Sequence, residues 1–331
     1  MIVEKVKNIK AVRDVWISLQ NDNEKMGPFQ YYQYYDVICR HNILYRLKER
    51  SVPEIYLIKT DGGDVKMIAP LCRLLGKERG YKILGNGQAA TLDFIYSGRI
   101  TDEEITQCLI ALKETLKGRL YLTRVKPESR LLNSPMISDP ENPIKFVSVH
   151  FKDGYDEFWG RLSKSTKQNI RTAYNHLKTD NKGFEFSRRK YQDLTDIEKK
   201  AISKLYFTRL TQKYDKPNNI IYRYLYENVH HYSVAFKALD NVDYYILKID
   251  GELSAFLAGM NNINGDYFIV PRLAIDDEFK RYSPGMILVN EVIKYMSEQT
   301  NIREFDLSRG DEKYKYVLGG EEYLACDYYV K

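Results

Sequence analysis

The chain has 331 residues, of which 44% are hydrophobic and 29% charged, and its formal net charge is +6 at pH 7. This length suffices for one large domain or two medium ones, and the composition is typical of a soluble globular protein. No stretch approaches the roughly 18 uninterrupted apolar residues that a membrane-spanning helix needs, so we expect no integral membrane segment.

The N-terminus and the cysteines indicate a cytoplasmic protein. The first residues, Met-Ile-Val-Glu-Lys-Val-Lys, lack the apolar centre of a signal peptide. The cysteines have neither metal-ligand nor redox spacing, so we expect reduced thiols at Cys39, Cys72, Cys108 and Cys326. Spacing also gives no support for a serine or cysteine nucleophile triad. We therefore expect no bound metal.

The first half of the chain predicts an α/β unit. Residues 1–50 have a helical pattern with a polar break, and Asp61-Gly62-Gly63-Asp64 is a strong hairpin turn signal. A helix is predicted at 102–117, where an acidic first turn suits the helix dipole. The predicted strands cover 55–60, 65–71, 81–84 and 120–123. Four of the ten prolines lie within 126–145, where we place a linker.

The pattern restarts at Phe146, which predicts a second α/β unit over 146–331 after a first over 1–145, although the residues themselves do not repeat. The predicted helices cover 156–177, 194–213, 218–230 and 286–299. The predicted strands cover 242–249, 254–260, 267–275, 303–307 and 322–330. Pro271 cannot donate a ladder hydrogen bond, so we expect the central strand to be disturbed there.

The basic excess of the chain is local. Residues 161–190 contain nine lysines or arginines against two acids, so the rest of the chain is close to neutral. Five of these cations share one face of the helix predicted at 156–177, namely Arg161, Lys164, Lys167, Arg171 and Lys178. Three interpretations stay open: a solvated face, a site for the phosphates of an acyl donor or an activated or lipid-linked sugar, and a site for tRNA.

The start of the helix at 286–299 is a candidate anion site. Ser283-Pro284-Gly285-Met286 places a Pro-Gly turn just before the helix, whose first N–H groups and partial positive charge suit a phosphate or pyrophosphate. The following strand carries Asp306 to Asp311 to its C-terminal end, where open α/β sheets collect ligands. The alternative is a plain helix-to-strand connection with surface charges.

These two blocks resemble a known family. Ser283-Pro284-Gly285-Met286-Ile287-Leu288, followed by Asp306-Leu307-Ser308-Arg309-Gly310-Asp311-Glu312 with Tyr314-Lys315, is similar to the C-terminal signature of the FemAB-like branch of the GNAT acyltransferases. The match is densest with the CelD-type acetyltransferases, which are associated with polysaccharide and envelope biosynthesis. Pro28-Phe29-Gln30 adds support. Two departures are Lys167, where arginine is more usual, and the acids Asp276 and Asp277, which follow Arg272 later than in the family.

The resemblance implies a tandem GNAT-like acyl-CoA N-acyltransferase fold of the α/β (α+β) class, with mixed sheets flanked by helices. The N-terminal domain would form the acceptor side. The C-terminal domain would carry the acyl-donor loop and the catalytic block. Acetyl-CoA or another acyl-CoA would be the co-substrate.

The same resemblance and the chemistry of acyl transfer nominate the site residues. The donor pyrophosphate is assigned to Arg281, Ser283, Pro284, Gly285 and Met286. The catalytic block is assigned to Asp306, Arg309, Tyr314 and Lys315. Asp306 would remove the acceptor's proton or, alternatively, pair structurally with Arg309; Arg309 and Lys315 suit an anion or the developing oxyanion, and Tyr314 the leaving thiolate. The acceptor is assigned to Asp93, Phe94, Lys164, Lys167 and Arg171.

Three functions follow as hypotheses. The first is acyl transfer from acyl-CoA to an amine or hydroxyl of a small-molecule or lipid-linked sugar or another cell-envelope precursor. The second is an aminoacyl-tRNA-dependent transfer to a peptidoglycan precursor, as in the Fem proteins, although no heptad stretch predicts their coiled-coil arm. The third is a non-catalytic binding module.

Overall fold

The computed structural model describes residues 1–40, 50–76, 80–87, 89–214, 219–228 and 231–331. The chain forms two compact units. Unit 1 comprises Met1–Lys145, part of α8 (His231–Ala238) and Tyr323–Lys331, and unit 2 comprises most of the remaining chain up to Glu322. Both ends of the helix expected at 218–230 lie outside the described residues.

Unit 1 is built on a sheet with the strand order β1-β2-β3-β4-β6-β13, and β5 also pairs with β3. Its strands are β1 Ile2–Val6, β2 Ser51–Lys59, β3 Val65–Leu74, β4 Gly80–Ile83, β5 Ile95–Tyr96, β6 Arg119–Val125 and β13 Glu321–Val330. Its helices are α1 Arg13–Asp22, α2 Tyr32–Arg40 and α3 Asp102–Thr115, with 3-10 turns at Ile9–Val12, Pro28–Gln30 and Arg130–Asn133. The pair β4 and β6 is parallel, and the helix α3 lies between these strands in the chain.

Unit 2 is built on a sheet with the strand order β7-β12-β11-β10-β9-β8. Its strands are β7 Glu141–His150, β8 Phe184–Arg189, β9 Val242–Ile249, β10 Glu252–Asn261, β11 Tyr267–Ile275 and β12 Glu304–Arg309. Its helices are α4 Tyr155–Arg161, α5 Lys164–Thr179, α6 Asp196–Tyr214, α7 Ile220–Asn228, α9 Pro284–Gln299 and α10 Lys313–Val317, with 3-10 turns at Tyr191–Asp193 and Asp277–Tyr282. The pair β11 and β12 is parallel, with α9 between them in the chain.

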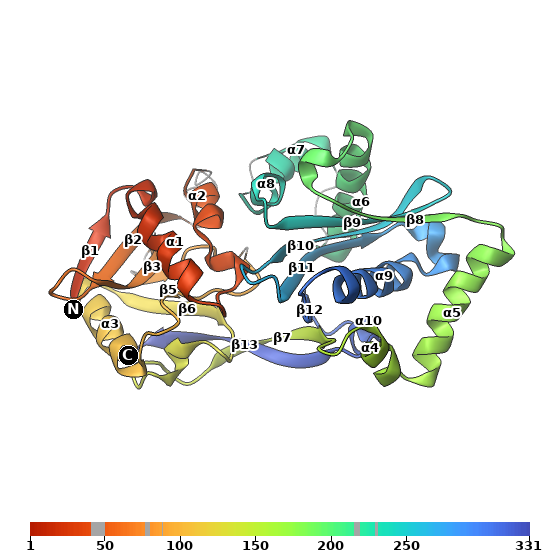
Figure 1. Cartoon of the computed structure of the whole chain (residues 1–331). Coiled ribbons are helices and arrows are strands. Elements are labelled where there is room, and N and C mark those ends of the chain that lie inside the picture. Colours follow the sequence, from red (N-terminus) through yellow and green to blue (C-terminus); the bar gives the residue numbers. More distant parts are fainter. Residues whose placement is uncertain (41–49, 77–79, 88, 215–218, 229–230) are drawn as a thin grey trace. The chain divides into compact units, whose positions relative to one another are not determined.

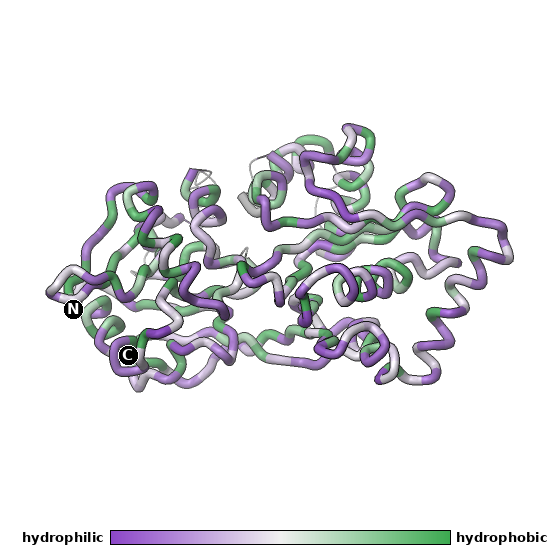
Figure 2. Tube along the Cα trace, viewed as in Figure 1, coloured by the Kyte–Doolittle hydropathy of each residue, from purple (hydrophilic) through white to green (hydrophobic). Residues whose placement is uncertain are grey.

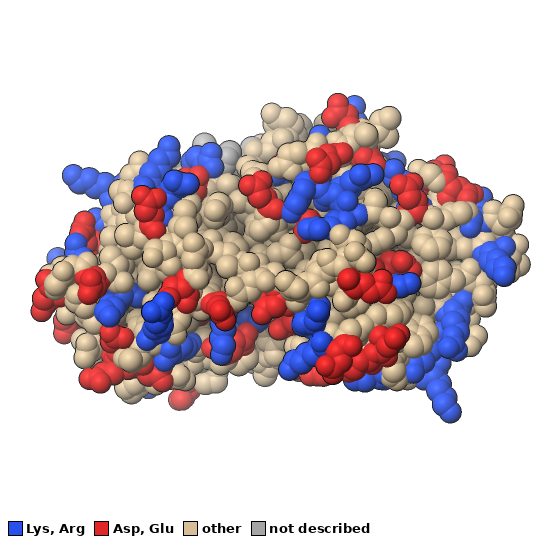
Figure 3. Space-filling model, in the orientation of Figure 1, with Lys and Arg blue, Asp and Glu red and all other residues tan. Residues whose placement is uncertain are grey.

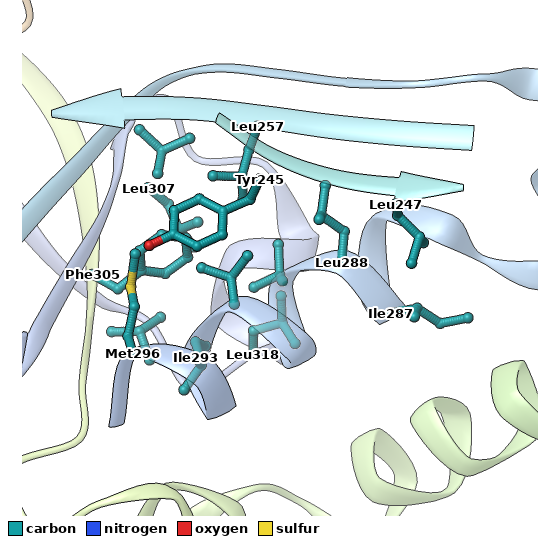
Figure 4. Close-up of a cluster of buried hydrophobic side chains, with 14 of the residues drawn as sticks. Tyr245, Leu247, Leu257, Ile287, Leu288, Ile293, Met296, Phe305, Leu307 and Leu318 are labelled. Carbon is teal, nitrogen blue, oxygen red and sulfur yellow. The ribbon is translucent and has the colours of Figure 1, made fainter. Parts of the chain in front are cut away.

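The core of unit 2 lies between α9 and the sheet. Leu288 and Met296 of α9 point toward side chains of the sheet, with Met296 beside Tyr245 (Figure 4). The tube of Figure 2 is hydrophobic along the central strands, whereas α5 is largely hydrophilic. In Figure 1, α9 lies on one face of this sheet and α6 on the other. The helix expected at 286–299 is therefore confirmed, and its apolar face is the one that packs.

Local signals in the sequence set the hairpin and the helix starts of unit 1. The turn between β2 and β3 contains Gly63 at a φ of 94°, a conformation that glycine adopts without strain. Thr101 and Glu104 form a capping box at the start of α3. The helical expectation for 1–50 was wrong at its beginning, where β1 pairs antiparallel with β2 from Ile2↔Lys59 to Val6↔Ile55.

No helix in the described part of the chain is long and apolar enough to cross a membrane.

Candidate active site

The two parallel strands of unit 2 separate part of the way along their length. Only three residue pairs join them, the last being Ile269↔Asp306. Beyond that pair β11 stays on β10 as far as Ile275, while β12 stays on β7 through Arg309↔Phe146. The facing backbone edges of β11 and β12 therefore lose their strand partner just after Asp306.

An irregularity in β11 accompanies the separation. Pairing with β10 passes from Met260↔Ile269 to Ala258↔Arg272, so β11 contains an extra residue there. Pro271 lies in this extra segment, where its missing N–H costs no regular ladder bond. Gly259 lies opposite, and a Cβ on it would lie 2.4 Å from the Ile269 carbonyl oxygen. A glycine is thus required where the two backbones approach.

Asp306 is buried in a hydrogen-bonded position at the point of separation. Its side chain is fully buried, the Tyr267 hydroxyl donates to Oδ2 at 2.6 Å, and the Ser308 N–H donates to Oδ1 at 2.6 Å. Its neighbours Phe305 and Leu307 belong to the core against α9. Because side chains alternate along a strand, Asp306 lies on the α6 face of the sheet. Tyr267 is only partly buried, so it is the more accessible member of the pair.

Lys315 has a different role from the one expected. Its ammonium donates to the carbonyls of Ser308, Arg309 and Gly310 at 2.9, 2.9 and 3.0 Å, and Glu312 Oε2 lies 3.1 Å away. An ammonium has three N–H groups, so these carbonyls engage all of them. Burial lowers the pKa of Lys315, although Glu312 opposes the change. The geometry makes Lys315 a support for the turn after β12, not a cation directed at a substrate.

Glu312 joins this turn to α6. Its Oε1 accepts from Lys213 Nζ of α6 at 2.8 Å. Burial raises the pKa of Glu312, but the ion pairs with Lys213 and Lys315 outweigh it and bring the pKa to about 2. Gly310 has a φ of 108° and no side chain, and this leaves space for the Glu312 carboxylate. A Cβ on Gly310 would lie 2.5 Å from Glu312 Oε2. Lys213 has no signal in the sequence, because only the fold brings it to this turn.

Tyr314 and Arg309 lie on the same turn. Tyr314 is partly buried and packs against the core of unit 2. Burial, assisted by the charge of Glu312, raises the pKa of Tyr314 to about 12, so its hydroxyl remains a proton donor near neutral pH. Arg309 is exposed at the end of β12. Both positions are compatible with the expected roles.

The start of α9 fits an anion in part. Ser283 has a left-handed backbone (φ 49°, ψ 54°), Pro284 is the first helical residue, and the first turn contains no acid. However, the amides of Met286 and Ile287 both donate to the Ser283 carbonyl, at 2.9 and 3.3 Å. These two N–H groups are therefore already engaged within the helix start, which limits the expectation that the first N–H groups bind a phosphate. Gly285 permits close packing, because a Cβ would lie 3.0 Å from a methyl of Ile275.

Arg281 is held by α5. Its guanidinium pairs with Asp180 at 2.7 and 3.1 Å, and its carbonyl lies 3.0 Å from His176 Nδ1. The hydrogen bond from Arg281 lowers the pKa of Asp180. A pyrophosphate bound by Arg281 would have to compete with this carboxylate.

The basic residues of α5 form an exposed face rather than a closed pocket. Lys167 Nζ donates to the Gly160 carbonyl at 2.9 Å, and the Arg171 guanidinium stacks over the Trp159 ring at 5.7 Å. Lys164 is exposed. The α5 edge of the molecule is accordingly basic in Figure 3.

Phe94 lies in the interior of unit 1, and Asp93 beside it is partly buried. Phe94 is fully buried, so it offers no surface to an acceptor. Asp93 accepts from the Phe94 N–H at 2.7 Å and from the Tyr96 hydroxyl at 3.0 Å. Burial raises the pKa of Asp93 to about 7, against opposing hydrogen bonds from Ser129 and Tyr96.

Unit 1 repeats the strand arrangement of unit 2 but differs from it beyond the parallel pair and at the helix start. Its parallel pair also joins three residue pairs, the last being Lys82↔Tyr121. Beyond these pairs the segment 89–92 lies against the edge of β6. The Leu92 N–H donates to the Arg124 carbonyl at 3.1 Å, and the Arg124 side chain donates to the Ala89 carbonyl at 2.6 Å. The first turn of α3 also contains three acids, which would repel a phosphate.

The comparisons with known proteins agree with this geometry. Residues 164–316 match the family described as an acetyltransferase (GNAT) domain. The chain is similar in structure to FemX (11% identity, TM-score 0.66, 99% of this chain and 97% of that chain covered). It is also similar to a conserved protein of unknown function from Bacteroides thetaiotaomicron VPI-5482 (13%, TM-score 0.60, 98% and 99%) and to L-PGS from Bacillus licheniformis (10%, TM-score 0.54, 83% and 83%). The comparison with curated proteins gives no match.

The chain thus has a tandem GNAT-like fold, with mixed sheets flanked by helices. The match of residues 164–316 to a GNAT acetyltransferase domain lies almost entirely within its second unit and supports an acyltransferase. Within the described residues, no group of three or more His, Cys, Asp or Glu side chains is placed to hold a metal ion.

Proposed function

We propose that this protein transfers an acyl group from acyl-CoA, with acetyl-CoA as the simplest donor, to an amine or hydroxyl of a sugar or another cell-envelope precursor. The observation that supports this proposal most is the separation of β11 and β12 beside a helix start without acids. Where β12 has parted from β11, the backbone of β11 can hydrogen-bond the amides of a pantetheine arm, and the N-terminus of a helix attracts a pyrophosphate.

The donor is assigned to the segment 281–286 of unit 2. Ser283, Gly285 and Met286 are at the helix start, where the macrodipole favours negative charge. Arg281 contributes to this segment if it exchanges Asp180 for a phosphate. The matching helix start of unit 1 has three acids, so we assign the donor to unit 2 alone.

Proton transfer is assigned to Tyr267 and Asp306. The acceptor nitrogen or oxygen attacks the thioester carbonyl, the carbon–sulfur bond breaks, and the acceptor loses a proton. Because Asp306 is buried behind the Tyr267 hydroxyl, we assign the proton to the carboxylate through that hydroxyl. Tyr314, which stays protonated near neutral pH, donates to the departing thiolate, while Arg309 stabilises the oxyanion.

The acceptor class follows from the resemblance to envelope and polysaccharide acetyltransferases and from the basic face of α5. Lys164, Lys167 and Arg171 suit the phosphates of a nucleotide-linked or lipid-linked sugar. Such precursors are made in the cytoplasm, which is the compartment we propose.

A second candidate uses aminoacyl-tRNA as the donor. It is favoured by α5, whose 16 residues include four lysines or arginines and no acid. The two candidates differ in the ligand that binds first and in the salt dependence of that binding.

Calorimetry with acetyl-CoA and filter retention of tRNA separate the two candidates. We expect acetyl-CoA to bind and release free thiol when an amino-sugar acceptor is added. Asp306→Asn should retain donor binding within about twofold and lose turnover by about a hundredfold or more. Tyr267→Phe should lose turnover similarly, with Tyr316→Phe, an exposed tyrosine, as the matched control. Absence of acetyl-CoA binding together with tight tRNA retention would overturn the acyl-CoA proposal.

A further inference from the structure

The helix α7 presents its aliphatic side chains to solvent. Ile220, Ile221, Tyr224 and Leu225 are 82%, 69%, 64% and 48% exposed, respectively. By the helical period these four residues share one face about 140° wide. Figure 3 shows largely uncharged surface over α7. Contiguous apolar residues on a surface mark a site of interaction.

The opposite face of α7 is packed, so the exposure is not a consequence of a loosely attached helix. The Tyr222 ring lies 5.8 Å from that of Phe207, and the Tyr226 ring lies 6.4 Å from that of Tyr206, both in α6. Arg223 also donates to Ser203 of α6 at 2.8 Å. Tyr222 and Tyr226 thus attach α7 to α6, whereas the aliphatic residues and Tyr224 point outward. In a surface helix the aliphatic side chains usually face the core, whereas in α7 they face the solvent.

The adjoining face of α6 extends this surface and adds positive charge. Ile197 is 81% exposed, and Lys200 and Lys204 are exposed on the same side of α6 by the helical period. Together α6 and α7 contain six lysines or arginines against three acids. All three acids are paired, Asp196 with Lys199 at 3.9 Å, Glu198 with Lys248 at 2.8 Å and Glu227 with Arg223 at 2.9 Å.

We infer that this α6–α7 surface (Ile197, Lys200, Lys204, Ile220, Ile221, Tyr224 and Leu225) docks on a lipid bilayer that contains anionic headgroups. The aliphatic side chains would enter the boundary between headgroups and acyl chains, Tyr224 would lie at the headgroup level, and the two lysines would contact lipid phosphates. With nine residues, α7 is too short to span a membrane, so it lies in the interface.

Charge favours a membrane over a second copy of the chain. A twofold dimer formed through this surface would bring Lys200 and Lys204 of both copies into one interface, which concentrates like charge there. An anionic bilayer complements them instead. The inference does not depend on the proposed reaction, because membrane docking can be measured without turnover.

Vesicle flotation tests the inference with the full chain. We expect binding to vesicles of phosphatidylcholine with phosphatidylglycerol, and much weaker binding to phosphatidylcholine alone. Ile221→Ser with Leu225→Ser should reduce the binding by about tenfold or more, because two aliphatic side chains no longer leave water. Lys200→Gln with Lys204→Gln should reduce it about tenfold on the anionic vesicles only. Ile110→Ser with Ile263→Ser, two exposed isoleucines on other elements, is the matched control and should bind as the wild type does.

Three results would overturn the inference. The first is no binding to either kind of vesicle, and the second is binding that survives the Ile221→Ser, Leu225→Ser change. The third is a concentration-dependent dimer, seen by light scattering, that the same change dissociates, since a second copy would then cover the surface. Because all substituted side chains are exposed, unchanged thermal unfolding should accompany each variant.

Discussion

A carboxylate placed at the start of α9 should selectively weaken donor binding. Ser283 is exposed, makes no side-chain capping hydrogen bond and has a left-handed backbone, which aspartate and asparagine tolerate. Ser283→Asp therefore adds a negative charge without disturbing packing. It should also stabilise the helix by about 0.3–1 kcal/mol through the macrodipole. The variant would thus fold at least as well as the wild type while losing affinity for an anion.

The size of the loss follows from Coulomb's law. Two unit charges about 5 Å apart in water repel by about 0.8 kcal/mol, so two phosphate charges give about 1.7 kcal/mol. This corresponds to a Kd for acetyl-CoA about fifteenfold higher at low ionic strength. Salt screens exposed charges over about 10 Å at 0.1 M, so the ratio should shrink as salt is added.

Calorimetry with two donors and two variants makes the measurement specific. Ser283→Asn has nearly the same shape without the charge, and it should bind acetyl-CoA within about twofold of the wild type. A donor that lacks the diphosphate, such as acetyl-pantetheine, should be used equally by all three proteins. If Ser283→Asp binds acetyl-CoA as tightly as Ser283→Asn does, the diphosphate does not lie at the start of α9 and the donor assignment fails.

Three further predictions concern stability. Gly259→Ala should destabilise the fold by about 2 kcal/mol or more in urea unfolding, because the new Cβ would meet the Ile269 carbonyl. Gly160→Ala has open space around the new Cβ and should be neutral or stabilising. Equal effects of the two substitutions would contradict the close approach of the backbones at Gly259. Lys315→Met should lower the free energy of unfolding by about 3 kcal/mol or more, since three carbonyls lose their donor. Lys313→Met, at an exposed position, should lower it little. A small decrease for Lys315→Met would favour a role of Lys315 at the substrate instead. Asp93 has a raised pKa in the folded state. Its contribution to the free energy of unfolding is therefore complete below the pKa that Asp93 has in the unfolded chain, and it is lost as the pH rises through about 7. Between pH 4 and pH 8 the urea midpoint of the wild type should therefore fall relative to that of Asp93→Asn. The fall should correspond to a loss of up to about 4 kcal/mol in the free energy of unfolding. If the midpoints of the two proteins change in parallel with pH, the raised pKa of Asp93 is refuted.

The fold could be predicted from the sequence where local signals are strong. The helix at 286–299 and the hairpin at Asp61-Gly62-Gly63-Asp64 each depend on residues close together in the chain. Pro271 predicted the irregularity of β11 because a missing N–H has the same consequence in any sheet. The strand β1 was missed because its partner β2 lies some fifty residues away, as the pair Ile2↔Lys59 shows.

The site was predicted less completely, for a physical reason. A sequence shows that Lys315 is a cation, but only the fold shows that three carbonyls surround it. The same holds for Phe94, whose burial depends on distant elements, and for Arg281, whose partner Asp180 lies a hundred residues earlier. Tyr267 opens a strand like many other tyrosines, and nothing near it in sequence indicates that its hydroxyl reaches Asp306.

The last strand of the chain completes the sheet of the first unit. β13 pairs with β6 from Cys326↔Val125 to Val330↔Leu120, so unit 1 remains one strand short until β13 has been synthesised. Before then the open edge of β6 is a template for strands of other chains. Residues 1–145 expressed alone should consequently aggregate, and during synthesis the first half of the chain can become a finished fold only after β13 has joined it.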